Sequence, residues 1–575
     1  MIRIFTSRFW RGGNFRQMED SFMKKWTSYV LIAAALVLAA CSPGTTNKAV
    51  PDQSTAATAA PSANYDDLVA LFKEWREFVK PNVVGGVPDY SAVAMKAHYA
   101  GLEKWRGRLA AIDPSDWTLS RWADYEVVRA EMNGFEFDHR VLRPWSRDAC
   151  FYTVVQDSPP DVPAREGPEL HGTLLLFAYS FPLSETDIPV FQAKLQVIPR
   201  ILEQAKVNLV EDAKDLFNLG IRVKKEESAV LGNLIKTLAK HHPDLVGDAE
   251  RAKTAVDNFR GWLEEKYETM SAPSGIGIEN YNWYMKNVHL VPYTWDEQVT
   301  ILQRELERSL TFLRFEENRN RSLPKLTMAA SAGEYDKRRR EAVKEFMDFI
   351  RDEGIFSVPD YLSLSEEPGG FSTGPEPVDF FLQVEYRNSL PLLCHSMHTF
   401  DLQRLKHETY PIRSVPLLYN IWDSRCEGFA TAFEEMAMQA GLMEKNPRAR
   451  ELVYVMLANR AARAMGDLMM HANKFTLDQA VDYACRWTPY DWLRRDRDTV
   501  WTDMRIYLHQ PFYGASYVIG KAQIDRLMAD RADQLGDKFT LKEFMDEFIG
   551  AGLIPMSLLR WQMTGLDDEM KILGK

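Results

Sequence analysis

The sequence predicts an all-α protein with one large multi-helix domain. Three observations predict it: apolar residues recur at helical spacing over long stretches, several stretches begin with a capping pair, and turn-rich segments separate them. The stretches with charged outer faces are 64–80, 118–142, 186–216, 224–241, 248–270, 295–318, 335–352, 378–407, 427–441, 448–472, 497–531 and 540–550.

Capping pairs mark three helix starts. In each pair a hydroxyl and a carboxylate or amide lie three residues apart, which satisfies backbone N–H groups of the first turn. The pairs are Thr294 with Glu297, Thr476 with Gln479, and Thr540 with Glu543. Turn-rich interruptions fall at 144–170, 271–277 and 354–377, and loops of that length in a compact domain often carry function.

The N-terminal region has the pattern of a lipoprotein signal. Residues 23–41 contain a basic start, an apolar run and the small residues Leu38-Ala39-Ala40 before Cys41, which is a lipobox. We therefore expect Cys41 to be acylated. The apolar run is shorter than the about 20 residues that a membrane span needs, although an uncleaved anchor helix is the alternative. Residues 1–22 form an upstream extension, with Met18 or Met23 as a plausible initiator.

A linker separates the anchor from the folded part. Residues 42–63 are rich in Ser, Thr, Ala and Pro, a composition that cannot bury a core. The helical domain is expected over 64–575, either as one domain or as two packed lobes. Ser42 after the acylated cysteine resembles Gram-negative lipoproteins sorted to the outer membrane, which places the domain in the periplasm.

Charge and cysteine usage exclude some functions. A net charge of −11 and a pI near 5.6 argue against a nucleic-acid partner, and the lipid is the only membrane contact we expect. Four cysteines follow Cys41, without a CxxC pair that would indicate a zinc ribbon or a thioredoxin-type site. Four allow three full pairings, among which the sequence does not choose.

Four stretches hold the polar residues that a helical enzyme would direct inward. One runs from 390 to 403 and places Cys394 and His398 on one helix face. A second places Glu427 and Glu434 two turns apart. The third and fourth are the stripe Arg463, Asp467 and His471, and an aromatic segment with Tyr507, Tyr513 and Tyr517.

These stretches resemble the bacterial family catalogued as domain of unknown function 885, which contains many lipoproteins. Its signature, His-Glu-x-x-Pro-Gly-His-His-Leu-Gln followed by Glu-Gly-Trp-Ala, aligns without a gap onto 394–403 and 427–430. The resemblance extends over roughly 65–565, through Arg463, Asp467, His471, Tyr507, Pro511, Tyr517 and Gly520, and upstream through 124–126, 143–145 and 281–284. It implies an all-helical fold distantly similar to gluzincin zinc peptidases, with a deep inter-helical cleft.

The chain departs from this signature at the metal. In the aligned frame Cys394 occupies the position of the first ligand histidine, His395 that of the catalytic glutamate, and Phe400 that of the second ligand histidine. Only Glu427, the third ligand, remains. A zinc peptidase needs two imidazoles, a carboxylate and a separate base, so the departure argues against ordinary zinc-peptidase chemistry.

Our first hypothesis is therefore a metal-free, cofactor-free enzyme, a lyase or hydrolase acting on a small or peptide substrate. His395 or His398 would transfer protons, Asp467 would orient His471, and Tyr507 or Tyr517 would stabilise developing charge. Substrate binding is assigned to Arg463, Tyr513, Tyr517 and Glu427.

Three alternatives remain open. Zinc would bind a rebuilt set of Cys394, His398 and Glu427. The resemblance also brings Cys394 and Cys426 near one centre, where a disulfide would replace the metal. The third alternative is a non-catalytic binding lipoprotein whose histidines are satisfied core residues.

Overall fold

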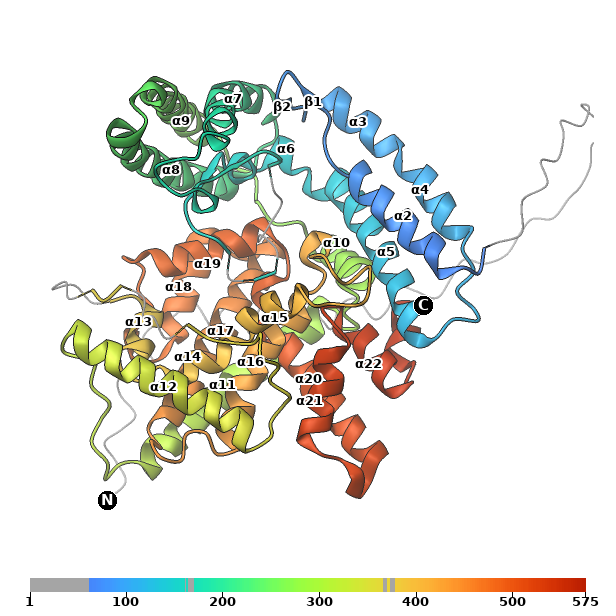
Figure 1. Ribbon diagram of the computed structural model, residues 1–575, viewed down its shortest axis with the longest axis vertical. Helices are drawn as coiled ribbons and strands as arrows, with labels where there is room; N and C mark the ends of the chain where they lie inside the picture. The colour runs from blue at the N-terminus through green and yellow to red at the C-terminus, as the bar shows by residue number, and fades with distance from the viewer. Residues whose placement is uncertain (1–61, 161, 164–169, 366–369, 373–377) are drawn as a thin grey trace, which may run out of the picture. The chain divides into compact units, whose positions relative to one another are not determined.

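Helices make up nearly all regular structure in the part of the chain that the computed structural model describes, residues 62–160, 162–163, 170–365, 370–372 and 378–575 (Figure 1). This confirms the all-α prediction. The predicted signal 23–41 with Cys41, the extension 1–22 and the linker up to residue 61 lie outside the described residues. Within them, no helix has the length and apolar character needed to cross a membrane.

The first helices form a layer around α5. They are α2 (Tyr65–Phe78), α3 (Ala92–Ala100), α4 (Leu102–Ala110) and α5 (Leu119–Phe137). Asn64 caps α2 through the backbone N–H of Asp66, and α2 buries Leu68, Leu71, Phe72 and Trp75 along one face. A π-helical turn, η1 (Asp138–Leu142), continues α5 and ends at Arg143, whose φ is 40°.

A second group of helices has its own hydrophobic cluster. Its helices are α7 (Asp187–Asn208), α8 (Lys214–His241), η4 (Pro243–Leu245) and α9 (Val246–Tyr267). Before them come α6 (Pro144–Arg147), η2 (Ala149–Tyr152) and η3 (Leu176–Ala178). The strands are two residues long and form an antiparallel pair, β1 (Val83–Val84) with β2 (Val87–Pro88), and a parallel pair, β3 (Val155–Gln156) with β4 (Leu174–Leu175).

The remaining helices form the larger cluster, together with α2, α4 and α5. In chain order they are α10 (Ile278–Tyr284), η5 (Met285–His289), α11 (Trp295–Arg319), α12 (Ala332–Asp352), α13 (Phe380–Glu385), α14 (Leu390–His395), α15 (Met397–Leu405), η6 (Leu418–Asn420), α16 (Asp423–Gln439), α17 (Ala449–His471), α18 (Leu477–Trp487), η7 (Pro489–Asp491), α19 (Asp498–His509), α20 (Tyr513–Leu535), η8 (Gly536–Lys538), α21 (Leu541–Gly550), α22 (Met556–Thr564) and α23 (Asp568–Leu573). The described part of the chain thus has two large hydrophobic clusters. That residues 64–575 form either one domain or two packed lobes stays a prediction.

Three predicted helices are wrong as continuous elements. The stretch 186–216 runs from α7, which ends at Asn208, into the start of α8 at Lys214. The stretch 378–407 is divided into α13, α14 and α15, and 497–531 is divided into α19 and α20. The break between α19 and α20 contains Pro511, which cannot donate a helical hydrogen bond, and Phe512, whose φ is 86°. Helices α3, α4, α6, α10, α18, α22 and α23 were not among the predicted stretches, although the capping box at Thr476 marks the start of α18.

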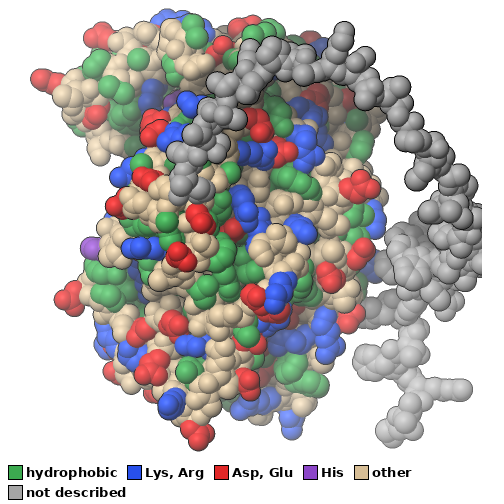
Figure 2. All heavy atoms as spheres, turned by 90° about the vertical axis from the view of Figure 1, so that its right-hand side faces the viewer, with side chains coloured by type: hydrophobic (Ala, Val, Ile, Leu, Met, Phe, Trp, Pro, Cys, Tyr) green, Lys and Arg blue, Asp and Glu red, His purple; other side chains and the backbone are tan. Residues whose placement is uncertain are grey.

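The outer surface mixes charges of both signs. Figure 2 shows basic and acidic side chains interspersed over the face that it presents. Many form pairs along a helix, such as Lys344 with Asp348 and Lys571 with Asp567. Such exposed pairs contribute little to stability, about 0–1 kcal/mol each.

Two glycines allow α16 and α20 to touch through their backbones. A Cβ atom on Gly428 would lie 2.5 Å from Cα of Gly520, and one on Gly520 would lie 2.1 Å from the carbonyl oxygen of Ser424. No side chain fits at either position without separating the helices. The contact places residue 427 of α16 next to the first turns of α20.

Substituting Gly520→Ala should destabilise the protein by at least about 2 kcal/mol, because the new methyl group overlaps the backbone of α16. Thermal and urea unfolding measure the change. Gly261→Ala is the matched control, since it lies inside α9 with no atom near the added Cβ; it should be neutral or stabilise by up to about 1 kcal/mol. Equal effects of both substitutions would contradict the close contact.

Candidate metal centre

Two histidines lie on either side of a helix break. His395 ends α14 and His398 lies in the first turn of α15, with Ser396 between the helices at φ −68° and ψ 16°. At the break the N–H of Ser396 donates to the carbonyl of Leu393, three residues back rather than four. Helix α14 contacts α16 and α17, and α15 contacts α16 (Figure 1).

The break brings both rings onto one carboxylate of α16. Nε2 of His398 lies 2.9 Å from Oε2 of Glu427, and Nε2 of His395 lies 3.6 Å from the same oxygen. The two Nε2 atoms are 3.2 Å apart. Three electron-pair donors therefore converge on one point.

The three groups of the centre differ in exposure. The side chain of His395 is 18% exposed, whereas those of His398 and Glu427 are 5% and 2% exposed. His395 is therefore the group of the three that is nearest to solvent.

Each converging group is held by a further contact. Nδ1 of His395 lies 2.9 Å from Oε1 of Glu434 and 3.1 Å from Nη2 of Arg460. Nδ1 of His398 lies 3.1 Å from Sγ of Cys426. These outer contacts fix the ring orientations.

The carboxylate is oriented in the same way. The hydroxyl of Tyr513, at the start of α20, donates to Oε1 of Glu427 at 2.5 Å. The other oxygen, Oε2, is left to face the two imidazoles. This hydrogen bond between Tyr513 and Glu427 is possible because α16 and α20 pack side by side.

Burial and charge oppose one another in the centre. Burial alone would lower the pKa of His398, but the carboxylate of Glu427 and the thiol of Cys426 raise it well above its usual value. Burial would raise the pKa of Glu427, yet His398 and His395 hold it well below its usual range. Glu427 is therefore ionised, and the site favours a positive charge beside it.

The donor set fits a tetrahedral metal ion. His395, His398 and Glu427 each offer one ligand atom, and these atoms all lie within 4.8 Å of one another. A tetrahedral zinc with bonds of 2.0–2.1 Å has ligand atoms about 3.3 Å apart, close to the spacings in the centre. Apart from the two imidazoles, buried Oε2 of Glu427 has no hydrogen-bond or ion-pair partner among the described residues, as expected of an atom that binds a cation.

The cysteine alternatives are corrected by this geometry. Cys394 is fully buried and does not belong to the converging set, in which His395 takes the place that was expected for the thiol. All four described cysteines are free, so Cys394 and Cys426 form no disulfide. Cys426 instead contacts Nδ1 of His398, the ring nitrogen that does not face Glu427. The expectation of one continuous helix produced the error, since it paired residues four apart.

The predicted pair Asp467 and His471 lies in a separate group. Both are fully buried, and Asp467 accepts the backbone N–H of Ala515 in the first turn of α20. His471 contacts the carbonyl of Tyr507 through Nε2, 2.8 Å away. These contacts hold the ends of α19 and α20. Burial lowers the pKa of His471 to about 4, which keeps the ring neutral.

The other predicted residues line one side of the centre. Arg463 pairs with Asp503 at 2.7 Å and lies over the rings of Tyr507 and Tyr517. Tyr517 packs against Tyr513 and stacks on His395 with ring centroids 6.2 Å apart. The fold thus brings Tyr513 and Tyr517 to the centre, while Arg463 is neutralised by a partner.

Two charged residues of the site were missed from the sequence. Arg460 binds Glu434 at 2.6 Å, and Asp503 neutralises Arg463. Arg460 lies three residues before Arg463 among Ala and Met residues of α17, and a guanidinium in so apolar a helix was a usable signal. Asp503 carries no such signal because α19 has a mixed composition.

Arg460→Met should destabilise the protein by about 3–5 kcal/mol, because it leaves the buried Glu434 carboxylate without its guanidinium. Urea unfolding measures the loss, and the double variant with Glu434→Gln should recover part of it. Arg314→Met, which removes the exposed pair with Glu317, should cost at most about 1 kcal/mol. A loss of stability in Arg460→Met as small as that in Arg314→Met would contradict a buried ion pair between Arg460 and Glu434.

Comparisons with known proteins agree with this fold. The chain is similar to a solved structure from Shewanella oneidensis described as a "putative lipoprotein of unknown function", at 15% identity and a TM-score of 0.65, covering 87% of this chain and all of that one. A lipoprotein structure from Colwellia psychrerythraea with a similar description matches at 16% identity and a TM-score of 0.58, covering 89% and 99%.

No protein with a curated description matches the chain by sequence. A family model does match, over residues 398–563, which begin at His398 and include Glu427, α17 and α20. The family is described as bacterial protein of unknown function (DUF885), and the resemblance found in the sequence is confirmed. Residues 398–563 are thus similar to the DUF885 family.

Proposed function

We propose that this chain is an envelope-anchored hydrolase that depends on a zinc ion held by His395, His398 and Glu427. The observation that carries the proposal is the convergence of three ligand atoms, Nε2 of His395, Nε2 of His398 and Oε2 of Glu427. Three protein ligands with one open position are typical of catalytic rather than structural zinc sites. When bound, zinc would activate water and polarise a carbonyl group of the substrate.

The chain's own residues supply orientation and access. Glu434 and Cys426 orient the two imidazoles, and Tyr513 orients the carboxylate. Substrate would approach past His395, on which the ring of Tyr517 stacks. Glu434 is engaged by Arg460, so it is not a free base. The chemistry we propose is therefore hydrolysis of a peptide or ester bond that relies mainly on the metal.

A metal-free acid–base enzyme is the second candidate, and one observation favours it. The close approach of His398 to Glu427 is also satisfied by a proton, because the carboxylate raises the pKa of His398. An imidazolium at His398, beside the ring of His395, would transfer protons without a cofactor. Metal content separates the two candidates.

We further propose that the domain works at the periplasmic face of the outer membrane, attached through acylated Cys41. The lipobox, Ser42 and the similar lipoprotein structures support this location. The mixed surface charge of Figure 2 and the net charge of −11 support a small-molecule or peptide substrate rather than a nucleic acid.

Metal analysis after exposure to zinc and desalting tests the proposal. The wild-type protein should retain about one zinc per chain, and His398→Ala and Glu427→Gln should retain none. His407→Ala is the control, because its exposed ring lies outside the converging set and should not alter zinc content. Zinc should also raise the unfolding temperature of the wild-type protein and of His407→Ala, but not that of His398→Ala or Glu427→Gln.

Turnover of peptide and ester substrates provides the second measurement. Chelation should abolish hydrolysis, and added zinc should restore it. Turnover that survives chelation while His398→Ala abolishes it would favour the metal-free candidate. Absence of stoichiometric zinc would refute the metal centre.

A further inference from the structure

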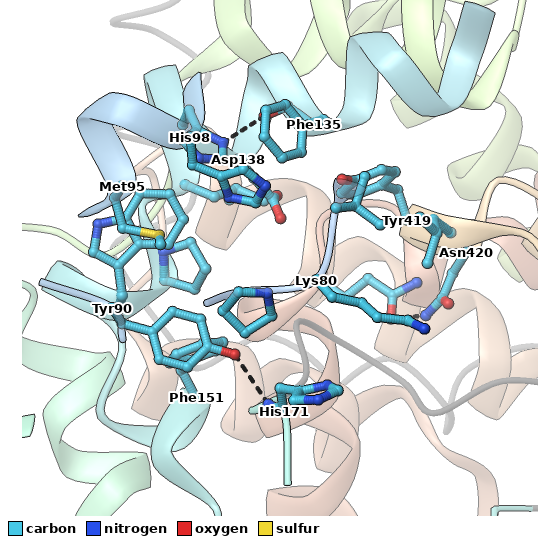
Figure 3. A pocket seen from close by; sticks show the side chains of 18 of the residues that line it. Lys80, Tyr90, Met95, His98, Phe135, Asp138, Phe151, His171, Tyr419 and Asn420 are labelled. Carbon is cyan, nitrogen blue, oxygen red and sulfur yellow. Dashed lines mark hydrogen bonds between the residues drawn. The ribbon is translucent and has the colours of Figure 1, made fainter. Parts of the chain in front are cut away.

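A cavity that shares no lining residue with the metal centre lies beside η1. Its volume is about 540 Å³, in the range of small-molecule binding sites. It is lined by residues from α2, α3, α5, η1, α10, η6 and the end of α19 (Figure 3). Lys80, His171 and Gly172 are exposed at its border, so the cavity communicates with solvent.

Aromatic rings form much of the wall. Figure 3 shows Phe135 and Tyr419 near Asp138, and Tyr90 and Phe151 farther along the same cavity. Tyr90 and Phe151 pack edge to face with ring centroids 4.9 Å apart. Such walls accept a flat apolar group and stabilise a cation over the ring faces.

The carboxyl group of Asp138 is the unusual feature of this cavity. It makes no hydrogen bond or ion pair with any described residue, and burial alone raises its pKa to about 8. In Figure 3 the carboxyl group is directed toward the space beside Tyr419. A desolvated carboxylate without a partner is costly, and a cationic ligand would remove that cost.

His139 supplies a second acceptor on the same wall. Its Nδ1 lies 2.9 Å from the carbonyl oxygen of Phe135, so Nδ1 carries the proton and donates it. Nε2 is then an acceptor, and it is buried without a hydrogen-bond partner in the described part of the chain. Burial lowers the pKa of His139 to about 4, which keeps this ring neutral.

The nearby cations are already paired. Arg76 binds Glu131 and the carbonyl of Pro416, and Lys80 binds Glu77 at the exposed rim. Neither forms a bond with Asp138. The inner end of the cavity therefore offers acceptors and aromatic faces to a ligand that brings its own N–H donors.

We propose that this cavity binds a small amine with an aromatic body, with the ammonium group on Asp138 and His139 and the apolar body between the rings. The site does not depend on the proposed zinc chemistry, since the two sets of residues are distinct. It adds a ligand class, arylalkylamines, to a protein whose other centre faces carbonyl substrates.

Tryptamine is the probe, and tryptophol is its uncharged counterpart with a hydroxyl in place of the amine. Calorimetry on the folded protein should give tryptamine about tenfold higher affinity than tryptophol. Asp138→Asn should remove the difference while leaving the unfolding temperature nearly unchanged. Asp116→Asn, an exposed aspartate, is the matched control and should bind like the wild-type protein.

The affinity for tryptamine should rise with pH up to about 8 and then level off, because the carboxyl of Asp138 must lose its proton to pair with the ammonium. The histidines and tyrosines facing Asp138 do not titrate in that window, because burial lowers the pKa of His98 and His139 and raises that of Tyr284 and Tyr419. Arg76 also lines the cavity and is paired with Glu131. His171 and His509 line other parts of the cavity, and Asp138→Asn separates their contribution.

Three results would overturn the proposal: no binding of tryptamine at millimolar concentration, equal affinity for tryptophol, or unchanged affinity after Asp138→Asn. Glu427→Gln should bind tryptamine normally. Loss of amine binding in that variant would mean that the amine occupies the metal centre instead, which also refutes the proposed cavity site. A protein that binds tryptamine but no zinc would refute the proposed function alone.

Discussion

The backbone contact between α16 and α20 fixes the geometry of the candidate metal centre. Because Gly428 and Gly520 lack side chains, the two helices approach more closely than side-chain packing allows. Glu427 and Tyr513 then meet across the interface, and the phenol directs one carboxylate oxygen so that the other faces His395 and His398. A single steric constraint between helices thus determines where the charge of Glu427 is placed.

The candidate metal centre shows how a short interruption of a helix changes which side chains meet. An ungapped alignment with the DUF885 signature implies a continuous helix, in which Cys394 and His398 share a face. At Ser396 the helix closes three residues back, and His395 turns toward His398 instead. The loss of the signature's histidines therefore does not mean the loss of two imidazoles on one carboxylate.

The fold class and most long helices could be predicted because amphipathic spacing depends on local sequence. The breaks at Ser396 and Pro511 and the short helices at the C-terminus depend on tertiary contacts, which periodicity does not report. Five residues of the candidate site, His395, His398, Glu427, Tyr513 and Tyr517, were named from residue type and motif, with His395 as an acid–base residue and not as a ligand. Arg460 and Asp503 were missed, because buried ion pairs join helices far apart in sequence. No sequence motif marked the residues that line the cavity at Asp138.

The π-helical turn η1 determines how its own side chains are directed. A π-turn accommodates one residue more than an α-turn, so it corresponds to a one-residue insertion absorbed within a helix. Such an insertion rotates the residues before it relative to the residues after it by about 100°. Asp138 and His139 stand within that turn, whereas Glu427 stands in regular helix. The direction of the Asp138 and His139 side chains therefore depends on the length of this turn, whereas that of Glu427 follows from regular helical geometry.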